Sequence, residues 1–294
     1  RWIADHVTEI RQQVGKVSRY AKLVSLDTRM LGNMVHVAFV YETGDAAGQN
    51  MTTTCTWQAC QWMMAQMAHY EEIRFDNFII EANMSGDKKV NYQSFIAGRG
   101  TRVLAEAFLS EEMLQAVLKV DSKLLLTAHH GFVAGSVQIG MVGYNINVAN
   151  IVAAMFTACG QDIACVHESS VAQLHLEGVE GGVYASMLMP SLIVGTVGGG
   201  THVQDQKDLL DLMGCAGPGH SRRLAEIIAG FCLSLDLSTL AAIASGQFAT
   251  AHEKMGRNRP VEWLKREELD PGFFQSGLRE ALANDTLEVT TLSP

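Results

Sequence analysis

The segment MVHVAFVYETGDAAGQNM, residues 34–51, decides the first part of the fold. Its first eight residues alternate as in a half-buried strand, and residues 52–70 have the spacing of a long helix rich in methionine and tryptophan. The connecting turn, TGDAAGQNM at residues 43–51, leaves the first N–H groups of that helix free at the positive end of its dipole. This arrangement suits a pyrophosphate, but a glycine turn capped by Asp45 or Thr52 explains the segment equally well.

Outward from this segment, helices and strands alternate closely. Residues 2–14 have an amphipathic helical pattern and residues 78–80 begin another strand. The later sequence is rich in Ala, Gly and Leu, and residues 183–197 are expected to form a buried strand with Pro190 at a break. Helices are predicted at residues 111–119, 147–158, 204–213, 221–235 and 237–245. The expected fold class is α+β: a small, open-faced, ferredoxin-like α/β domain joined to a larger, helix-rich α/β domain.

The polar segment NMSGDKKVNY, residues 83–92, interrupts this pattern and predicts a connecting loop. We therefore expect a small domain at residues 1–78, a connecting loop at residues 79–95 and a large domain at residues 96–294. Loops that join rigid elements often carry functional side chains.

Composition excludes several classes of protein. The 294 residues are 48% hydrophobic and 18% charged, which is enough apolar surface for a sizeable core. The net charge of −9 argues against a surface for nucleic acid or for an anionic membrane. None of the six cysteines forms a CxxC pair, which favours a reducing, cytoplasmic compartment.

No membrane-spanning segment is expected. The longest apolar candidate, residues 186–197, is interrupted by Pro190 and Gly195. The chain opens with Arg1 rather than methionine, inside a predicted helix, so residues upstream of it are expected to be missing.

Two further segments combine a loop with glycine or with charge. GTVGGGT, residues 195–201, places three consecutive glycines after the buried strand, which lets a ligand approach the backbone with no Cβ in the way. We favour a ligand loop over a structural turn. In the DKK sequence, Asp87 can keep Lys88 charged and aimed at a developing oxyanion. On spacing alone, a solvated run of surface charges explains DKK better.

Asp162 and His252 are ambiguous from the sequence. Asp162 follows an apolar helix, either as a helix-end residue or as a buried carboxylate that tunes a neighbour. His252 either protonates a leaving group near neutral pH or caps a helix. No metal site is expected, because the adjacent His129 and His130 cannot both face one ion and the HExxH motif is absent.

Taken together, the motifs resemble the hydroxymethylglutaryl-coenzyme A reductase family over nearly the whole chain. The resemblance rests on TGDAAGQNM, the DKK loop, GRG at residues 98–100, GYNINVANIVAAMFTACGQD at residues 143–162, GTVGGGT and the segment around His252, in this order. It implies NADPH bound by the small domain and an acyl-coenzyme A bound by the large domain. It also implies an active site at the interface of a homodimer or a higher even oligomer.

The resemblance assigns roles to individual residues. Lys88 would be the catalytic lysine, Asp162 would be hydrogen-bonded to it, and His252 would protonate the departing thiolate. The nucleotide would be bound by Arg19, which would favour NADP over NAD, and by Asp45, Gln49, Asn50, Met51, Gly198, Gly199, Gly200 and Thr201. The acyl-coenzyme A would be bound by Asn83, Asp87, Lys89, His130 and Asn150.

Three departures from the family pattern leave the acyl group open. A family glutamate in an EGxLVAS-like segment has no counterpart here, the lysine that anchors the acyl carboxylate is replaced by His130, and the histidine before the ANIV helix is replaced by Asn147. The resemblance implies NADPH-dependent, four-electron reduction of 3-hydroxy-3-methylglutaryl-coenzyme A to mevalonate. The alternatives are a reductase of another acyl thioester and a non-catalytic homologue that binds a nucleotide or coenzyme A.

Overall fold

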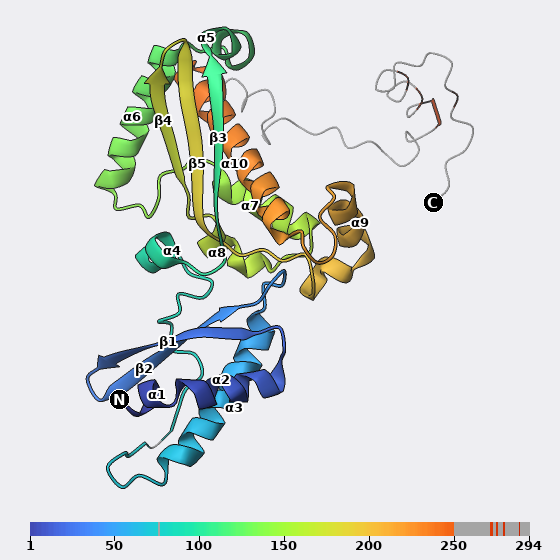
Figure 1. The fold of residues 1–294 in the computed structure, drawn as a ribbon. Coiled ribbons are helices and arrows are strands. Elements are labelled where there is room, and N and C mark those ends of the chain that lie inside the picture. Colours follow the sequence, from blue (N-terminus) through green and yellow to red (C-terminus); the bar gives the residue numbers. More distant parts are fainter. Residues whose placement is uncertain (76, 250–270, 273–274, 276–278, 280–287, 289–294) are drawn as a thin grey trace. The chain divides into compact units, whose positions relative to one another are not determined.

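The computed structural model describes residues 1–75, 77–249, 271–272, 275, 279 and 288. The chain divides into two units, residues 1–247 and residues 248–294. The first unit holds two antiparallel sheets and the helices that pack on them (Figure 1). This mixture of helices and sheets confirms the predicted α+β class.

The first sheet is a two-stranded hairpin of β1 (Lys22–Leu31) and β2 (Met34–Glu42). Its tight turn contains Gly32 at φ +60°, a conformation that such turns require and that glycine adopts readily. The accompanying helices are α1 (Trp2–Asp5), α2 (Val7–Val17) and α3 (Gln49–Met67). We call the cluster of side chains buried between them the hairpin core; it includes Ile10, Val14, Cys55, Ala59 and Met63.

Two sequence predictions for this part of the chain need correction. Strand β1 is not predicted from the sequence, because charged residues such as Asp27 and Arg29 interrupt its apolar pattern. Residues 78–80 were expected to begin a strand, but the structure has none there. Their sequence, Phe-Ile-Ile, favours a strand locally, yet a strand also needs a hydrogen-bonded neighbour.

The second sheet has the strand order β3–β5–β4, with β3 at Thr101–Ser110, β5 at Gly182–Leu192 and β4 at Gln173–Val179. The long helix α10 (Ser221–Ala244) runs along one face of this sheet and contacts β3 and β5 (Figure 1). We call the side chains buried here the sheet core; they include Phe156, Met187, Met189, Ile228 and Leu240.

Two predictions for the sheet core also need correction. Pro190 does not break β5, because it lies beyond the last pair with β4 and within a bulge of β5, where Pro190 and Ser191 lie opposite Arg102 of β3 and a missing N–H is tolerated. The helices predicted at residues 221–235 and 237–245 form the single helix α10, inside which Asp236 is fully buried. By length and composition alone α10 could cross a membrane, although half of its most apolar stretch is buried inside the structure.

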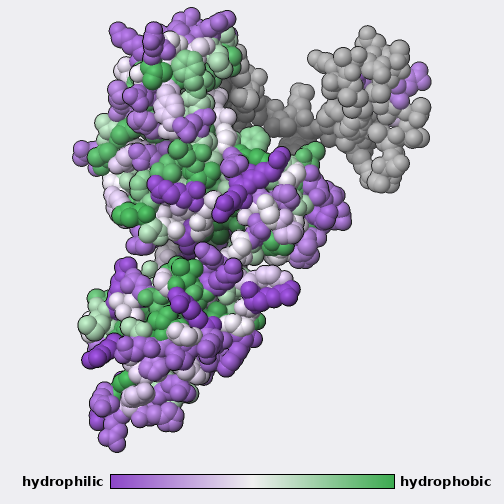
Figure 2. Space-filling view, in the orientation of Figure 1, coloured by the Kyte–Doolittle hydropathy of each residue, from purple (hydrophilic) through white to green (hydrophobic). Residues whose placement is uncertain are grey.

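The remaining elements connect these layers. They are α4 (Tyr92–Ala97), α5 (Glu111–Met113), the π-helix η1 (Leu114–Leu118), α6 (Ser122–Gln138), α7 (Val148–Ala158), the 3-10 helix η2 (Ile163–Cys165), α8 (Val166–Ser169), the 3-10 helix η3 (Gly199–His202) and α9 (Gln204–Leu212). Helix α6 lies beside β4, and α7 packs against α10 (Figure 1). Hydrophilic residues cover most of the visible face of the first unit, with smaller apolar patches between them (Figure 2).

Candidate active site

The connecting loop holds Lys88 in a strained conformation. Lys88 has φ +56° and Asn83 has φ +61°, in the left-handed region that costs a residue with a side chain free energy. Gly86, between them, has φ +68°, and a Cβ added there would lie 2.5 Å from Nδ2 of Asn91. Strained backbone persists where surrounding contacts fix it, and it is concentrated at functional sites.

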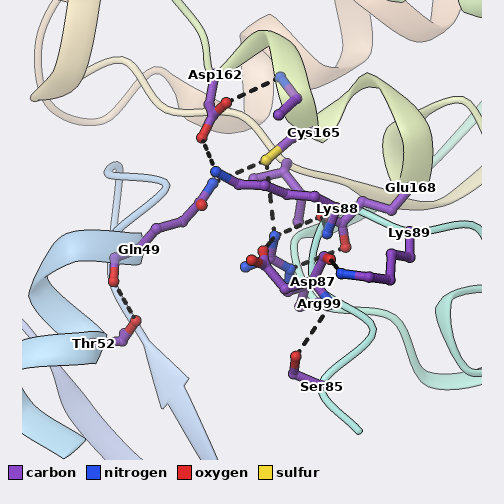
Figure 3. Close-up of polar contacts among 12 residues, drawn as sticks. Gln49, Thr52, Ser85, Asp87, Lys88, Lys89, Arg99, Asp162, Cys165 and Glu168 are labelled. Atoms are coloured by element: carbon purple, nitrogen blue, oxygen red, sulfur yellow. Dashed lines mark hydrogen bonds and ion pairs between the residues drawn. The ribbon is translucent and has the colours of Figure 1, made fainter. Parts of the chain in front are cut away.

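The ammonium group of Lys88 forms an ion pair with Asp162, with 2.8 Å between Nζ and Oδ2 (Figure 3). Asp162 also accepts a hydrogen bond from the N–H of Ala164 at the start of η2. The Lys88–Asp162 hydrogen bond raises the pKa of Lys88 and lowers the pKa of Asp162. The two side chains are 35% and 37% exposed, so this ammonium is fixed, charged and still open to a ligand.

A second ion pair holds the main chain of Lys88. Glu168, on α8, is 1% exposed and accepts hydrogen bonds from Nε of Arg99 at 3.0 Å and from Nη2 of Arg99. The main-chain N–H of Lys88 donates to the same carboxylate at 3.0 Å. Nη2 of Arg99 also donates to Asp87 (Figure 3). This pair is not predicted from the sequence, in which Arg99 appears only as part of the GRG motif and Glu168 belongs to no motif.

Gln49 joins the first turn of α3 to this cluster. Its Nε2 donates to Sγ of Cys165 at 2.9 Å (Figure 3). Cys165 lies in the same short segment as Asp162 and Glu168, and burial raises the pKa of its thiol to about 11. The thiol therefore stays protonated at neutral pH, and the start of α3 lies close to the Lys88–Asp162 pair.

The main chain of the TGDAAGQNM turn is tied to the GTVGGGT loop. The carbonyl oxygen of Asp45 accepts a hydrogen bond from the N–H of Thr196 at 2.8 Å. A Cβ on Gly195 would lie 2.7 Å from the nitrogen of Ala47, so only glycine allows this approach. The amide of Gln161 pairs with both backbone groups of Gly195, at 2.8 and 2.9 Å, which ties the segment before Asp162 to the same loop.

The carboxylate of Asp45 caps α10. It accepts hydrogen bonds from the N–H of Gly219 at 2.8 Å, the N–H of Ser221 at 3.2 Å and the hydroxyl of Ser221 at 2.6 Å. The Ser221 hydroxyl contributes most to lowering the pKa of Asp45. The carboxylate thus has a structural partner, and its assignment to the nucleotide site stays a prediction.

The glycines of the GTVGGGT loop fall into two groups. Gly195 and Gly200 allow close packing; a Cβ on Gly200 would lie 2.7 Å from the carbonyl oxygen of Gly160. Gly198 and Gly199 are exposed, have φ +77° and +58°, and have nothing within 4 Å of an added Cβ. Thr201 donates its hydroxyl proton to the carbonyl oxygen of Gly198 at 2.7 Å. The space open to a ligand therefore lies at Gly198 and Gly199.

The N-terminus of α3 is open. Its N-cap, Gly48, has φ +76° and provides no side chain to bond the first N–H groups. By contrast, Asp236 accepts hydrogen bonds from the N–H groups that precede α7, and Asp45 does the same for α10. An uncapped helix N-terminus with free N–H groups and a positive dipole end favours a phosphate group.

Three predicted nucleotide residues lie at or near this helix end. Asn50 is exposed in the first turn, and Sδ of Met51 accepts a hydrogen bond from Ser18 at 3.0 Å. That contact brings the neighbouring Arg19 to the same end of α3. Arg19 is exposed, and its guanidinium lies over the ring of Tyr20, with its central carbon 4.8 Å from the ring centre.

The predicted acyl-coenzyme A residues are more scattered. Asn83 and Lys89 are exposed on the connecting loop, and Nζ of Lys89 donates to the carbonyl oxygen of Asp87 at 3.1 Å. His130 is exposed on α6, and Nδ2 of Asn150, on α7, donates to the side-chain oxygen of Asn147, the N-cap of that helix, at 3.1 Å. His252 lies outside the described residues. Within the described residues, no group of three His, Cys, Asp or Glu side chains lies close enough to hold a metal ion.

Comparisons with known proteins agree over most of the chain. Residues 1–257 match the family model described as hydroxymethylglutaryl-coenzyme A reductase. The chain is 38% identical to the 3-hydroxy-3-methylglutaryl-coenzyme A reductase of Pyrococcus abyssi, over 87% of this chain and 64% of that protein. It is 33% identical to the protein of the same name from Methanocaldococcus jannaschii, over 87% of this chain and 64% of that protein. It is 37% identical to the protein of the same name from Catharanthus roseus, over 83% of this chain and 41% of that protein. The chain therefore spans less than two thirds of the length of these relatives.

A solved structure shares the fold. It is the class II 3-hydroxy-3-methylglutaryl-CoA reductase from Streptococcus pneumoniae, bound to NADPH in open conformations. The TM-score is 0.58 with 15% sequence identity, covering 83% of this chain and 66% of that one. At this identity the likeness concerns the fold alone.

Proposed function

Because this chain belongs to the hydroxymethylglutaryl-coenzyme A reductase family, we propose that it catalyses the NADPH-dependent, four-electron reduction of 3-hydroxy-3-methylglutaryl-coenzyme A to mevalonate. The observation that carries this proposal is the Lys88–Asp162 pair, a fixed and partly exposed ammonium on a strained loop. The names of its relatives and the NADPH in the solved neighbour support the choice of substrate and cofactor.

The structure offers a fitting place for the nucleotide. The open N-terminus of α3 would hold a phosphate group, the exposed backbone at Gly198 and Gly199 would approach the nucleotide, and Arg19 would bind the phosphate that distinguishes NADP from NAD. When bound, NADPH supplies the hydrides for the reduction.

Lys88 would provide the electrostatic stabilisation. Reduction of a thioester carbonyl builds negative charge on its oxygen, and a fixed ammonium group stabilises that charge in the transition state. Asp162 would keep Lys88 oriented and charged, as their hydrogen bond and the raised pKa of Lys88 support. By resemblance, His252 would protonate the departing thiolate of coenzyme A.

A second candidate keeps the chemistry and changes the acyl group. His130 stands where the family lysine anchors the acyl carboxylate, and an imidazole would hold a carboxylate less firmly. Asn147, which replaces the family histidine, donates its amide to Thr239 at 2.7 Å and its N–H to Asp236 at 2.7 Å, so it is held within the fold. These two residues favour a different acyl thioester as the alternative substrate. A homodimeric, cytoplasmic enzyme remains part of the proposal by resemblance.

The test is a stoichiometry measured on the full-length protein. With 3-hydroxy-3-methylglutaryl-coenzyme A, two NADPH should be oxidised for each coenzyme A thiol released. Lys88→Met should lower turnover by a factor of about 100 to 1,000 while NADPH binding, followed by fluorescence, stays near normal. Lys123→Met, at an exposed lysine on α6, is the matched control and should keep the wild-type rate.

Each other outcome has a defined meaning. NADPH consumption with another acyl thioester, but not with this one, would select the second candidate. No consumption with any thioester of a panel would reject the enzymatic proposal in favour of a binding protein. A Lys88→Met variant at the wild-type rate would remove Lys88 from the reaction.

A further inference from the structure

One short segment, residues 162–168, contacts both the side chain and the main chain of Lys88. Asp162, at the start of η2, accepts from the ammonium group of Lys88 at 2.8 Å, and Glu168, on the adjoining α8, accepts from its main-chain N–H at 3.0 Å. We propose that Glu168 and Arg99 are positioning residues, which fix the main chain of Lys88 so that its ammonium group stays in place beside Asp162. The catalytic consequence of this inference rests on the proposed function; the positioning itself does not.

The carboxylate of Glu168 depends on Arg99. A carboxylate that is 1% exposed needs charge-assisted hydrogen bonds, and Arg99 supplies two of them in a bidentate pair. Arg99 is itself fixed to the sheet, because its carbonyl oxygen accepts from the hydroxyl of Ser191 on β5 at 2.7 Å. The contacts therefore run from a core strand through Arg99 and Glu168 to the nitrogen of Lys88.

Such a pair does more for geometry than for stability. Buried ion pairs often contribute little net stability, because desolvation offsets their attraction, and fixing one arrangement is an alternative reason for their presence. Here the arrangement fixed is a lysine with φ +56°, in a loop whose neighbours Asn83 and Lys89 are exposed. Without the bond from its N–H to Glu168, we expect Lys88 to relax from this conformation and its ammonium group to move. A displacement of about 1 Å at a reacting centre can reduce the rate about 100-fold.

The first arm of the test measures how well the ammonium group of Lys88 is held in place, and it does not depend on enzymatic activity. In the full-length protein, acylation of Lys88 by an amine-directed reagent is followed by peptide mass spectrometry at several pH values, with Lys89 as the internal reference. The groups facing Lys88 are Asp162, Asp87 and Cys165. Glu168→Ala should make Lys88 react several-fold faster relative to Lys89, because an ammonium group that leaves Asp162 loses its protection. Glu168→Gln, which keeps an acceptor for the N–H, should lie between Glu168→Ala and the wild type.

The second arm measures catalysis. Glu168→Gln should lower kcat by about 10- to 100-fold and leave the KM for NADPH nearly unchanged. In the double variant with Lys88→Met, turnover should equal that of Lys88→Met alone, because Glu168 acts only through Lys88. Glu180→Gln, an exposed glutamate at the turn between β4 and β5, is the matched control and should behave as wild type in both arms.

The outcomes separate the two proposals. If the labelling of Lys88 is unchanged in both Glu168 variants, the positioning role is wrong. If labelling changes as expected but no acyl thioester is reduced even by the wild type, positioning stands and the proposed function fails. If the double variant loses the product of the two single losses, Glu168 supports the fold generally and the inference is overturned. Should Glu168→Ala fail to fold, Glu168→Gln and Arg99→Lys carry the test, since Arg99→Lys keeps the charge but loses the bidentate contact.

Discussion

Replacing Asp45 with alanine should destabilise the junction between the TGDAAGQNM turn and α10. The carboxylate accepts three hydrogen bonds there, from Gly219 and from the N–H and hydroxyl of Ser221. Loss of a capping side chain costs about 0.5–2 kcal/mol, and loss of a negative charge at a helix N-terminus costs about 0.3–1 kcal/mol. Together we expect a loss of about 2 kcal/mol, which lowers the Tm of a unit of this size by about 4–8 °C.

The assay is thermal unfolding followed by circular dichroism at pH 7. Asp27→Ala is the matched control, since Asp27 forms an exposed ion pair with Arg29 on β1, and such pairs contribute about 0–1 kcal/mol. Asp27→Ala should therefore lower the Tm much less. If Asp45→Ala melts at the wild-type temperature, the capping role of Asp45 is refuted.

The pH dependence provides a separate check on the same residue. Hydrogen bonds from Ser221 and Gly219 lower the pKa of Asp45 in the folded protein, while the unfolded value is about 3.9. The stabilisation by the carboxylate is therefore fully present above the unfolded pKa and is lost as the pH falls through the folded pKa. The difference in Tm between wild type and Asp45→Ala should narrow below about pH 4. A difference that stays constant on acidification would contradict this account.

Two further predictions concern buried contacts. Gly160→Ala would place a Cβ 2.4 Å from the carbonyl oxygen of Gly200, so it should lower the free energy of unfolding in urea by about 1–3 kcal/mol. Gly131→Ala is the matched control: it has open space on α6 and should not destabilise the protein. A destabilised Gly131→Ala would show that this comparison of glycines is wrong. Asp236→Asn keeps only one acceptor oxygen for the two N–H groups before α7, so it should cost about 1–3 kcal/mol in thermal unfolding, and an unchanged Tm would contradict the capping role of Asp236.

The motifs found in the sequence lie together in the structure, but the contacts among them could not be predicted. Each of the DKK, GQD, TGDAAGQNM and GTVGGGT segments contributes to one connected region of the structure. The hydrogen bond between Arg99 and Glu168 could not be predicted, because it joins residues 69 positions apart and neither residue belongs to a periodic pattern. The sequence also does not show whether the carboxylate of Asp45 bonds to the start of a helix or to a ligand. An acidic residue in a loop is a suitable hydrogen-bond acceptor for either.

The fold was predicted best where periodicity was strong. The predicted helices at residues 147–158 and 204–213 correspond closely to α7 and α9. Strand β4 was missed although Leu174 and Leu176 are buried while His175 and Glu177 are exposed, so an alternating signal was present. The continuity of α10 was missed for a different reason: a charged residue at Asp236 suggests a break, and only tertiary structure supplies the N–H groups that accommodate its buried carboxylate.

The spacing between Asp162 and Glu168 has a consequence for how this chain can change over time. Both residues hold Lys88, and η2 and α8 join them through a short helical path. Since each helical residue turns the chain by about 100°, one inserted or deleted residue would direct one of the two carboxylates away from the lysine. We therefore expect descendants of this sequence to vary the side chains between these positions while keeping their number. The β1–β2 turn requires only a residue that tolerates a positive φ at Gly32, so we expect insertions and deletions to be tolerated there.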